Sequence, residues 1–351
     1  MMSATMKAIQ LQAPGGPEVL QLVELPLPQP QAGEVRVRAM AIGAGGPDVL
    51  IRNGTYKWMP PMPAIPGNEM AGIVDAVGPG VTALQAGQRV FVSARELAQR
   101  GGCYAEAICV PEAAPFVLPD AIRFEDAVSL GNFQLALAML SSNGNLPARS
   151  VLIPGAAGGV ATALVQVAQG RGLRVIGTAS TPQKREFARA NGAHEVIESD
   201  PQGLTEKVMQ LTGGRGVDLA FDHLGGDLFI ACLRALAPFG MAVSYNIVNG
   251  PPTGDVFEEL RRLLGRSLAV RTFSIHAIDA DAVQRRGFME AAIALMAEGR
   301  VHAPKPTLFS LAEARHAHEL LDSGGTLGKI VLLPRGDWPA LRVPNLGRQA
   351  A

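Results

Sequence analysis

The stretch Val151-Leu-Ile-Pro-Gly155-Ala-Ala157-Gly158-Gly159-Val160-Ala161 decides the fold, because an apolar run ends there in a glycine-rich turn. An apolar, helix-like segment follows, and a second apolar run begins at Leu173. Glycine lets a diphosphate approach the backbone N–H groups at the start of the helix, where the helix dipole favours negative charge. A glycine-rich turn alone is a weak signal. The βαβ spacing around it predicts a dinucleotide-binding loop rather than a plain strand–helix turn. The loop residues are Gly155, Ala156, Ala157, Gly158, Gly159 and Val160.

The residues after the second strand favour NADPH over NADH. An NAD site usually carries a carboxylate there, which binds the ribose 2′-hydroxyl. This chain instead reads Thr178-Ala179-Ser180-Thr181-Pro182-Gln183-Lys184. Hydroxyl groups and an ammonium group would bind a 2′-phosphate, which a carboxylate would repel. We therefore expect Ser180, Thr181 and Lys184 to bind NADPH. The same residues also suit the N-cap and first turn of a helix, and the two roles are compatible.

The composition argues against several classes of protein. The chain has 351 residues, enough for two domains with separate cores. Its 31 basic and 31 acidic residues balance, which argues against a nucleic-acid or polybasic membrane surface. No apolar run reaches the roughly 20 residues of a membrane span, and the first residues lack a secretory apolar region. We therefore expect a cytoplasmic protein. Cys103, Cys109 and Cys232 are too few for a disulfide framework.

Two patterns divide the chain near residue 130. Up to there, short β-rich runs bounded by Gly or Pro predict an irregular β-barrel. From about residue 131, apolar strands alternate with helical patterns, which predicts a parallel sheet with helices on both faces. The expected strands are 150–154, 174–178, 195–197, 219–222, 241–245 and 268–273. The expected helices between them are 159–171, 182–191, 203–212, 227–236 and 256–264.

Beyond residue 274 we expect two more helices, at 281–298 and 311–323, and a strand at 329–333 that returns to the first domain. The expected organisation is a catalytic domain that begins with 1–130, a dinucleotide-binding domain at 131–274, and a return to the catalytic domain at 275–334. The segment 335–351 has two prolines and no periodicity, and we expect a C-terminal tail there.

With these residues in view, the chain resembles the zinc-free medium-chain dehydrogenases/reductases of the NADPH:quinone oxidoreductase group. The similarity runs from about Met6 to Pro334. The motifs that carry it are Ala13-Pro-Gly-Gly-Pro-Glu-Val-Leu20, Ala41-Ile-Gly43, Pro66-Gly67, Ala71-Gly-Ile-Val74, the 155–160 loop, Phe221-Asp222-His-Leu-Gly-Gly226, Val243-Ser244-Tyr245 and 324–334. The resemblance implies an α/β fold: a GroES-like irregular β-barrel domain and a Rossmann domain with a doubly wound parallel sheet. It also implies NADPH as the cofactor and commonly a homodimer.

The resemblance also bears on zinc. Zinc-dependent members bind the metal with a Cys in the loop after Ile42, a His before Glu69, and a Cys or Asp near residue 132. This chain has Gly45, Asn68 and Asn132 in those regions, and neither glycine nor a neutral amide is a competent zinc ligand. We therefore expect no metal. We expect surface or capping roles for the six histidines, His194, His223, His276, His302, His316 and His318.

The resemblance further implies which residues surround the nicotinamide. Quinone reductases of this group place an Asn and two Tyr there, and this chain has Gly45, Leu50 and Tyr56; Leu135 stands where a Thr is usual. We expect Tyr56 to act either as a proton donor or as a ring wall, and Asp48 to act as a structural hydrogen-bond partner. The loop 53–65 suits either one wall of a flat apolar pocket or ordinary packing on the barrel. The expected pocket residues are Gly45, Asp48, Leu50, Tyr56, Trp58, Met62 and Asn132.

Five further residues are expected near the cofactor from the same resemblance. Four follow the fifth and sixth strands of the parallel sheet: Tyr245, Asn246, Phe273 and Ile275. The fifth, Lys329, resembles a family lysine near the cofactor phosphate, and a strand-surface lysine is an equally open interpretation.

These features predict an NADPH-dependent reductase of quinones or α,β-unsaturated carbonyl compounds that transfers hydride without zinc. One alternative is a 2-enoyl thioester reductase, which would need a basic rim. Its candidate residues, Arg261, Arg262, Arg266, Arg285 and Arg286, suit solvated helix faces equally well. The other alternative is a non-catalytic NADPH-binding protein. Expected partners are a small conjugated carbonyl compound and a second copy of the chain through the strand 268–273, with no nucleic acid and no membrane.

Overall fold

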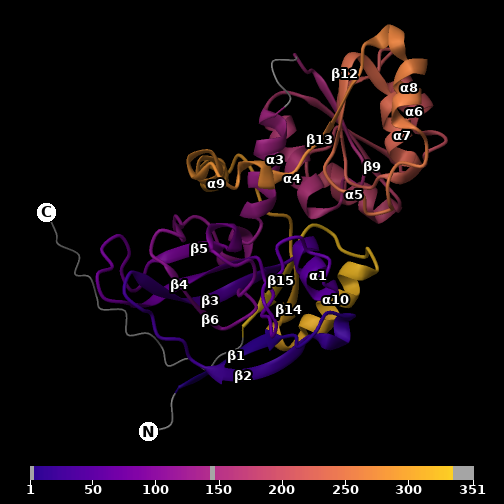
Figure 1. Ribbon diagram of the computed structural model, residues 1–351. Helices are drawn as coiled ribbons and strands as arrows, with labels where there is room; N and C mark the ends of the chain where they lie inside the picture. The colour runs from indigo at the N-terminus through magenta and orange to yellow at the C-terminus, as the bar shows by residue number, and fades with distance from the viewer. Residues whose placement is uncertain (1–3, 143–146, 335–351) are drawn as a thin grey trace, which may run out of the picture. The chain divides into compact units, whose positions relative to one another are not determined.

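The computed structural model describes residues 4–142 and 147–334 (Figure 1). These residues form two compact units, each with its own core. The first unit consists of 4–128, 307–325 and 330–334, and the second consists of 129–142, 147–306 and 326–329. The predicted tail 335–351 lies outside the described residues.

The first unit is built on a mixed sheet with the strand order β14-β15-β3-β4-β5-β7, in which β6 also pairs with β3. A separate β1–β2 hairpin adds a two-stranded antiparallel sheet. Strand β15 pairs antiparallel with β3, which confirms the predicted return of the chain to this domain. The strands are β1 (Thr5–Gln10), β2 (Gln21–Pro26), β3 (Glu34–Ala44), β4 (Glu69–Val77), β5 (Arg89–Ser93), β6 (Ala107–Pro111), β7 (Phe116–Val117), β14 (Thr307–Ser310) and β15 (Ile330–Leu333).

Short helices complete the first unit. They are η1 (Pro17–Val19), α1 (Gly46–Asn53), η2 (Ala94–Glu96), α2 (Phe124–Ala127), η5 (Leu311–Glu313) and α10 (Ala314–Asp322). The core lies between the mixed sheet and α10, and includes Ile9, Ile42, Met70 and Tyr104.

The second unit contains, within its described residues, a six-stranded parallel sheet with the order β10-β9-β8-β11-β12-β13. This is the strand order 3-2-1-4-5-6 of dinucleotide-binding folds, and it confirms the predicted fold class. The strands are β8 (Ser150–Ile153), β9 (Arg174–Ala179), β10 (Glu195–Glu198), β11 (Val217–Asp222), β12 (Leu236–Ser244) and β13 (Ala269–Thr272). All six predicted strands are present, with boundaries shifted by at most five residues.

Helices cover both faces of this sheet. Figure 1 shows α6, α7 and α8 gathered on one face, with α4 and α5 on the other. The helical elements are α3 (Leu130–Ser141), α4 (Gly159–Gly170), α5 (Pro182–Ala190), α6 (Leu204–Leu211), α7 (Gly226–Arg234), α8 (Val256–Arg262), η3 (Leu264–Arg266), η4 (Ile275–Ile278) and α9 (Ala282–Ala297). Across the residues described in both units, no helix is long and apolar enough to cross a membrane.

The structural boundary between the units differs from the predicted one. We expected the return to the first domain at residue 275, but residues 275–306 belong to the second unit. The reason is that α9 packs on α3, and the Gln134 amide of α3 donates a hydrogen bond of 2.8 Å to the Arg285 carbonyl of α9. Helix α3 was not predicted. It is apolar nearly all round because it is buried, so it lacks the amphipathic period that identifies surface helices.

The segment after β3 forms helix α1, which was not predicted. Pro47 occupies the first turn, and the Asp48 carboxylate accepts a 2.9 Å hydrogen bond from the backbone N–H of Gly45, the N-cap residue. Gly54 ends the helix with a φ of 75°, a left-handed conformation that favours glycine. This short helix fixes the positions of Asp48 and Leu50.

Candidate cofactor and substrate site

The predicted phosphate loop lies between β8 and α4, at the carboxyl end of the central strand. Gly155 has a φ of 61°, and the N–H of Gly158 donates a 3.0 Å hydrogen bond to the Gly155 carbonyl. The N–H of Ala156 donates to the Thr178 carbonyl of β9 at 2.8 Å. Gly158 is the N-cap of α4, so the first N–H groups of that helix point toward the mouth of the loop. This arrangement matches a diphosphate-binding turn.

Two residues from distant parts of the sequence lie against this loop. The N–H of Gly328 donates a 3.0 Å hydrogen bond to the Ala157 carbonyl, and Gly328 forms a parallel bridge with Gly158. A Cβ on Gly159 would lie 2.8 Å from the Asn132 amide nitrogen and 2.9 Å from the Gly328 carbonyl, so glycine is required there. Lys329, next to Gly328, is only 5% exposed, which argues against an ordinary strand-surface lysine.

The predicted 2′-phosphate ligands lie at the end of β9. Thr181 is the N-cap of α5, and its hydroxyl accepts a hydrogen bond of 3.2 Å from the backbone N–H of Lys184. The capping role is therefore present in the structure. Ser180 and Thr181 are both exposed, whereas Ala179 beside them is buried. Because both hydroxyls are exposed, Ser180 and Thr181 can also bind a phosphate while Thr181 caps α5.

Strand β11, which pairs with β8 on the side away from β9, ends in the buried Asp222, and the partly buried His223 follows it. The Asp222 carboxylate accepts hydrogen bonds from the N–H groups of Leu224 and Gly225, at 3.2 Å and 2.8 Å. Burial raises the pKa of Asp222 to about 6 against these stabilising bonds. His223 follows, and its Nδ1 lies 3.2 Å from the Tyr245 hydroxyl. Burial lowers the pKa of His223 to about 4, so the ring is neutral at pH 7.

The expected surface or capping role does not describe His223 fully, because its partly buried side chain packs on the chain around it. The ring lies against the phosphate loop: a Cβ on Gly155 would lie 2.6 Å from His223 Cε1 and 3.0 Å from Nε2. The signal that could have found it is its position, directly after a strand of the dinucleotide-binding sheet.

The remaining predicted cofactor residues follow β12 and β13. Tyr245 comes directly after β12, and its N–H donates to the Asp222 carbonyl at 2.9 Å. Asn246 is exposed, and its side-chain oxygen accepts a 2.8 Å hydrogen bond from Ile247 N–H. Phe273 follows β13, and Ile275 opens η4. Because the carboxyl ends of parallel strands meet at one edge of the sheet, these positions share the edge that holds the phosphate loop.

This edge fits a dinucleotide. Cβ atoms at Gly155 and Gly159 would fill the turn, so only glycine leaves the backbone accessible there. The end of β9 carries hydroxyls and no carboxylate, which suits a phosphate on the adenosine ribose.

The predicted substrate residues of the first unit lie around α1. Asp48 is 2% exposed, and its carboxylate accepts hydrogen bonds from Gly45 N–H and from the Asn68 amide, the latter at 2.8 Å. Two of the three residues at the positions of zinc ligands, Gly45 and Asn68, are thus hydrogen-bonded to Asp48, and a glycine and neutral amides do not fit a zinc ion. The described residues contain no group of three or more His, Cys, Asp or Glu side chains placed to hold a metal.

The apolar members of the predicted pocket lie at and beyond the end of α1. The Tyr56 ring is 9% exposed and meets Trp58 edge to face, with 5.7 Å between ring centroids. The Lys57 ammonium lies 5.3 Å from the Trp58 ring centroid. Leu50 and Met62 are 41% and 36% exposed, which is high for apolar side chains. Asn132 belongs to the second unit and lies against the start of α4.

Another histidine is fully buried, against expectation. His318 of α10 is 0% exposed; its Nδ1 lies 3.3 Å from Arg52 and its Nε2 lies 3.0 Å from the Tyr104 hydroxyl. Arginine has no acceptor, so Nδ1 accepts and Nε2 carries the hydrogen that it donates to Tyr104. Burial, and secondarily the Arg52 charge, lower the pKa of His318 to about 4.

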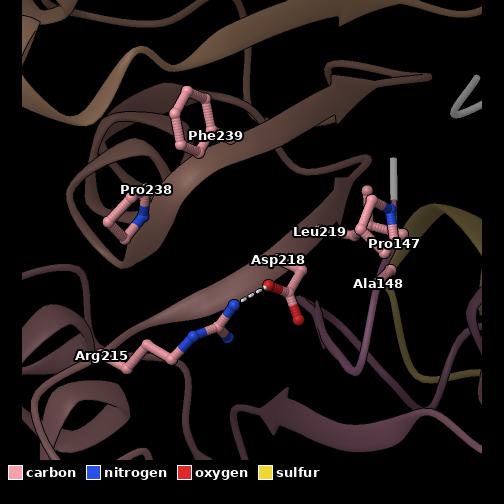
Figure 2. Close-up of a pocket in the computed structure, with 7 residues that line it drawn as sticks. All are labelled: Pro147, Ala148, Arg215, Asp218, Leu219, Pro238 and Phe239. Carbon is pink, nitrogen blue, oxygen red and sulfur yellow. Dashed lines mark hydrogen bonds and ion pairs between the residues drawn. The ribbon is translucent and has the colours of Figure 1, made fainter. Parts of the chain in front are cut away.

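A cavity of about 240 Å³ lies elsewhere in the second unit (Figure 2). Asp218, near the start of β11, lines it together with Arg215, and the two form an ion pair. Asp218 also accepts hydrogen bonds from Arg149 and Ser150 backbone N–H groups. This cavity lies at the amino ends of the strands, opposite the carboxyl edge where dinucleotides bind. It is not the cofactor site.

Family models match both units. The "Alcohol dehydrogenase GroES-like domain" matches residues 31–120, and the "Zinc-binding dehydrogenase" matches residues 159–297. The "Zinc-binding dehydrogenase" match does not include Gly45, Asn68 or Asn132. The word zinc in its description is therefore no evidence for zinc ligands in this chain.

Several proteins that are similar to this chain over nearly its whole length are quinone oxidoreductases. A quinone oxidoreductase of Pseudomonas aeruginosa is 33% identical over 333 residues, which cover 93% of this chain and 99% of that protein. The crystal structure of Escherichia coli quinone oxidoreductase complexed with NADPH has a TM-score of 0.80 and 32% identity, covering 94% of this chain and 100% of that one. The Pseudomonas syringae enzyme has a TM-score of 0.82 and 30% identity, with coverage of 94% and 100%. This chain therefore belongs to the medium-chain dehydrogenase/reductase superfamily, and within it to the quinone oxidoreductase group.

Proposed function

We propose that this protein is an NADPH-dependent reductase of quinones and other conjugated carbonyl compounds that works without zinc. The observation that carries the proposal is the carboxyl edge of the parallel sheet. There a glycine turn at the N-terminus of α4 adjoins the exposed hydroxyls of Ser180 and Thr181, with no carboxylate at the end of β9. The NADPH complex of the Escherichia coli relative supports the same cofactor.

The chain's own residues bind and orient this cofactor. The N–H groups at the start of α4 would hold the diphosphate, and Ser180, Thr181 and Lys184 would hold the 2′-phosphate. NADPH, when bound, supplies the hydride. Lys329 adds a cation next to the loop. Fixing both reactants in a reactive orientation supplies much of the rate enhancement in such a reaction.

The substrate class follows from what the site lacks. A simple ketone that accepts hydride becomes a localised alkoxide, which usually needs an electrophile such as zinc. A quinone or an enone becomes a delocalised anion that needs less electrophilic help. Asn68 and Gly45 offer no zinc ligand, and both are hydrogen-bonded to Asp48. A conjugated acceptor is therefore the substrate class that this chain is best equipped to reduce.

The shape of the substrate is proposed from the side chains near α1. Gly45 and Leu50 stand where relatives carry polar or bulky groups, and Leu50 and Met62 present exposed apolar surface. Trp58 adds an aromatic face beside Tyr56. These residues would favour flat apolar rings larger than a small benzoquinone.

The thioester reductase alternative gains no support from its proposed basic rim. Arg262 is paired with Glu258 and Glu259, and Arg266 donates to the carbonyls of Arg234 and Leu236. Guanidinium groups engaged in this way are poorly available to bind the phosphates of a CoA group.

A substrate panel followed by NADPH absorbance tests the function. We expect turnover with naphthoquinones and conjugated enones, lower activity with benzoquinone, and little with saturated ketones or simple alcohols. Faster turnover of saturated ketones would contradict the substrate class. NADPH binding without turnover of any conjugated acceptor would favour a non-catalytic role.

Metal analysis tests the zinc-free mechanism. We expect elemental analysis of the active enzyme to give well under one zinc per chain. A chelator should leave activity unchanged, because the positions that hold zinc in relatives are occupied by a glycine and by amides. One zinc per chain, with activity lost on its removal and restored on its return, would overturn this prediction.

A further inference from the structure

The His223 ring closes the β11 side of the phosphate loop. A Cβ on Gly155 would lie 2.6 Å from its Cε1 and 3.0 Å from its Nε2, and a Cβ on Gly158 would lie 3.8 Å from the same Nε2. The Cε1–Nε2 edge of the imidazole therefore faces the turn itself. The opposite nitrogen, Nδ1, is held by the Tyr245 hydroxyl at 3.2 Å, and the two rings lie 5.5 Å apart.

The hydrogen bonds of the described residues favour one tautomer of His223. Among the described residues, the Tyr245 hydroxyl has His223 Nδ1 as its sole hydrogen-bond partner, and Nε2 has none. If Nδ1 carried the hydrogen, the tyrosine O–H would lack an acceptor and Nε2 would lack a donor. If the tyrosine donates to Nδ1, only one group, an Nε2–H, seeks a partner. The second arrangement leaves fewer polar groups unsatisfied.

A neutral ring supports this assignment. Burial lowers the pKa of His223 to about 4, and it raises the pKa of Tyr245, so the phenol keeps its proton and donates it. With the Tyr245 hydroxyl bonded to Nδ1, the Nε2–H of His223 is a hydrogen-bond donor at the sheet edge that carries the phosphate loop.

We propose that His223 is a cofactor-binding residue, and that its Nε2–H donates a hydrogen bond to an oxygen in the nicotinamide half of NADPH. Strand order selects that half. The adenosine ribose belongs at the end of β9, on one side of the loop, and His223 follows β11, on the other side. An acceptor there is a ribose hydroxyl or the adjoining phosphate oxygen. Tyr245 is the positioning residue that fixes the tautomer. The inference rests on NADPH being the cofactor, and it is independent of the substrate.

Calorimetric binding to the full-length protein tests the assignment with two ligands, NADPH and 2′,5′-ADP. The second ligand contains only the adenosine half. We expect His223→Ala to raise the Kd for NADPH about 3- to 10-fold, the scale of one hydrogen bond. The Kd for 2′,5′-ADP should stay within about twofold. Equal weakening of both ligands would mean that the ring only shapes the loop, and an unchanged NADPH Kd would mean that it makes no contact; either result overturns the proposal.

Two amide replacements separate a donor at Nε2 from simple packing. The Gln side chain places its NH₂ group near the position of Nε2, whereas Asn reaches only the position of Nδ1. We expect His223→Gln to recover most of the NADPH affinity and His223→Asn to resemble His223→Ala. Equal affinities for the Gln and Asn variants would overturn the proposal.

A double-mutant cycle tests the part played by Tyr245. Tyr245→Phe should weaken NADPH binding in the wild type and add nothing in His223→Ala, because the hydroxyl acts through the imidazole. Additive losses would show that Tyr245 acts on its own. The matched control is His194→Ala, which removes a histidine whose Nδ1 accepts from Val175 N–H at the amino ends of the strands. It should bind both ligands like the wild type. Wild-type protein that bound neither ligand would refute the NADPH assignment itself, whereas NADPH binding without quinone turnover would refute only the proposed substrate.

Discussion

At the scale of single residues, the choice between NADPH and NADH rests on three side chains at the end of β9. Thr181 already serves as the N-cap of α5, and that bond orders the turn on which Ser180 and Lys184 stand. A pre-ordered turn loses little conformational entropy when it binds a phosphate. The N-cap at Thr181 is therefore compatible with 2′-phosphate binding by the same turn, and it supports that role.

Replacing Lys184 tests the cofactor preference. We expect Lys184→Ala to weaken NADPH binding by about 1–2 kcal/mol, the scale of a charge-assisted hydrogen bond, and to leave NADH nearly unchanged. Arg189→Ala is the control, since it removes a cation from the far end of the same helix. Titration calorimetry measures both. Equal affinity of the wild-type protein for the two cofactors would remove the basis of the prediction.

Tyr56 is the one predicted catalytic residue, and its surroundings favour packing. Its ring is 9% exposed and contacts Trp58 edge to face, an arrangement worth about 0.5–1.5 kcal/mol. We expect Tyr56→Phe, which keeps the ring, to lower kcat by less than about threefold and to act mainly on KM. A fall in kcat of about 10²-fold or more would instead identify the hydroxyl as a proton donor.

The contacts of two histidines, His223 and His318, could not be predicted from the sequence. The glycine turn and the hydroxyls after β9 were predictable because short segments of chain carry their chemistry. His223 meets Tyr245, and His318 meets Arg52 and Tyr104, across 22 to 266 residues of sequence. Neither histidine has a local pattern that signals these contacts, so the expectation of surface roles missed the partial burial of His223 and was wrong for the fully buried His318.

At the scale of elements, α10 and α1 are linked by the buried hydrogen bond between His318 and Arg52. The pKa of His318 is about 4 in the folded protein, against about 6.5 for an unfolded histidine. Between these values the unfolded chain binds a proton that the folded chain does not. The stability linked to this group is therefore complete above about pH 6.5 and is lost as the pH falls towards 4.

We expect this loss to appear as a difference between the wild type and His318→Gln. Gln retains a donor for Tyr104 but does not titrate. Between pH 7.5 and pH 5 the wild type should lose about 2 kcal/mol more of its unfolding free energy than the variant does. Asp222 and His223 titrate in both proteins, so their contributions cancel. Denaturant unfolding at the two pH values measures the difference, and parallel pH profiles would contradict the assignment.

The parallel strands and their crossover helices were predictable because apolar runs alternated with helical periods. Helices α1 and α3 were not. The first is only two turns long and was missed, although Pro47, Asp48 and Gly54 carry its start and stop signals. The second is buried on several sides and has no polar face to reveal its period.

At the scale of the whole molecule, the sheet of the second unit has an open edge. Within the described residues β13 pairs with β12 alone. The N–H of Phe273 donates to the Ser244 carbonyl, so by the two-residue period of a strand the N–H groups of Val270 and Thr272 face the open edge. Open edges of this kind can pair with a second copy of the chain.

Light scattering at micromolar concentration tests this pairing. We expect a homodimer for the wild type and a monomer for Val270→Pro, which removes an outward N–H and leaves the β12 pairing intact. Val270→Thr keeps the N–H and should remain dimeric, and all three proteins should bind NADPH. A monomeric wild type, or a dimeric proline variant, would contradict an edge-paired dimer.

The predicted domain boundary at 275 failed for a reason that operates at the same scale. The sequence of residues 282–297 does not indicate which unit the helix packs on, and its partner α3 is 140 or more residues earlier in the chain. Only the tertiary contact between the two assigns α9 to the second unit.

The hydrogen bond from the Gly328 N–H to the Ala157 carbonyl makes the Gly328 amide a probe of motion at the phosphate loop. That amide hydrogen is held by a carbonyl of the loop, so it can exchange with deuterated water only when the hydrogen bond between Gly328 and the loop breaks. Residue 328 stands two residues before β15, so the opening is recorded in a peptide far from the glycine turn in sequence. The exchange rate of one amide therefore reports how readily the 328 segment and the phosphate loop separate in the unlabelled, unmodified protein.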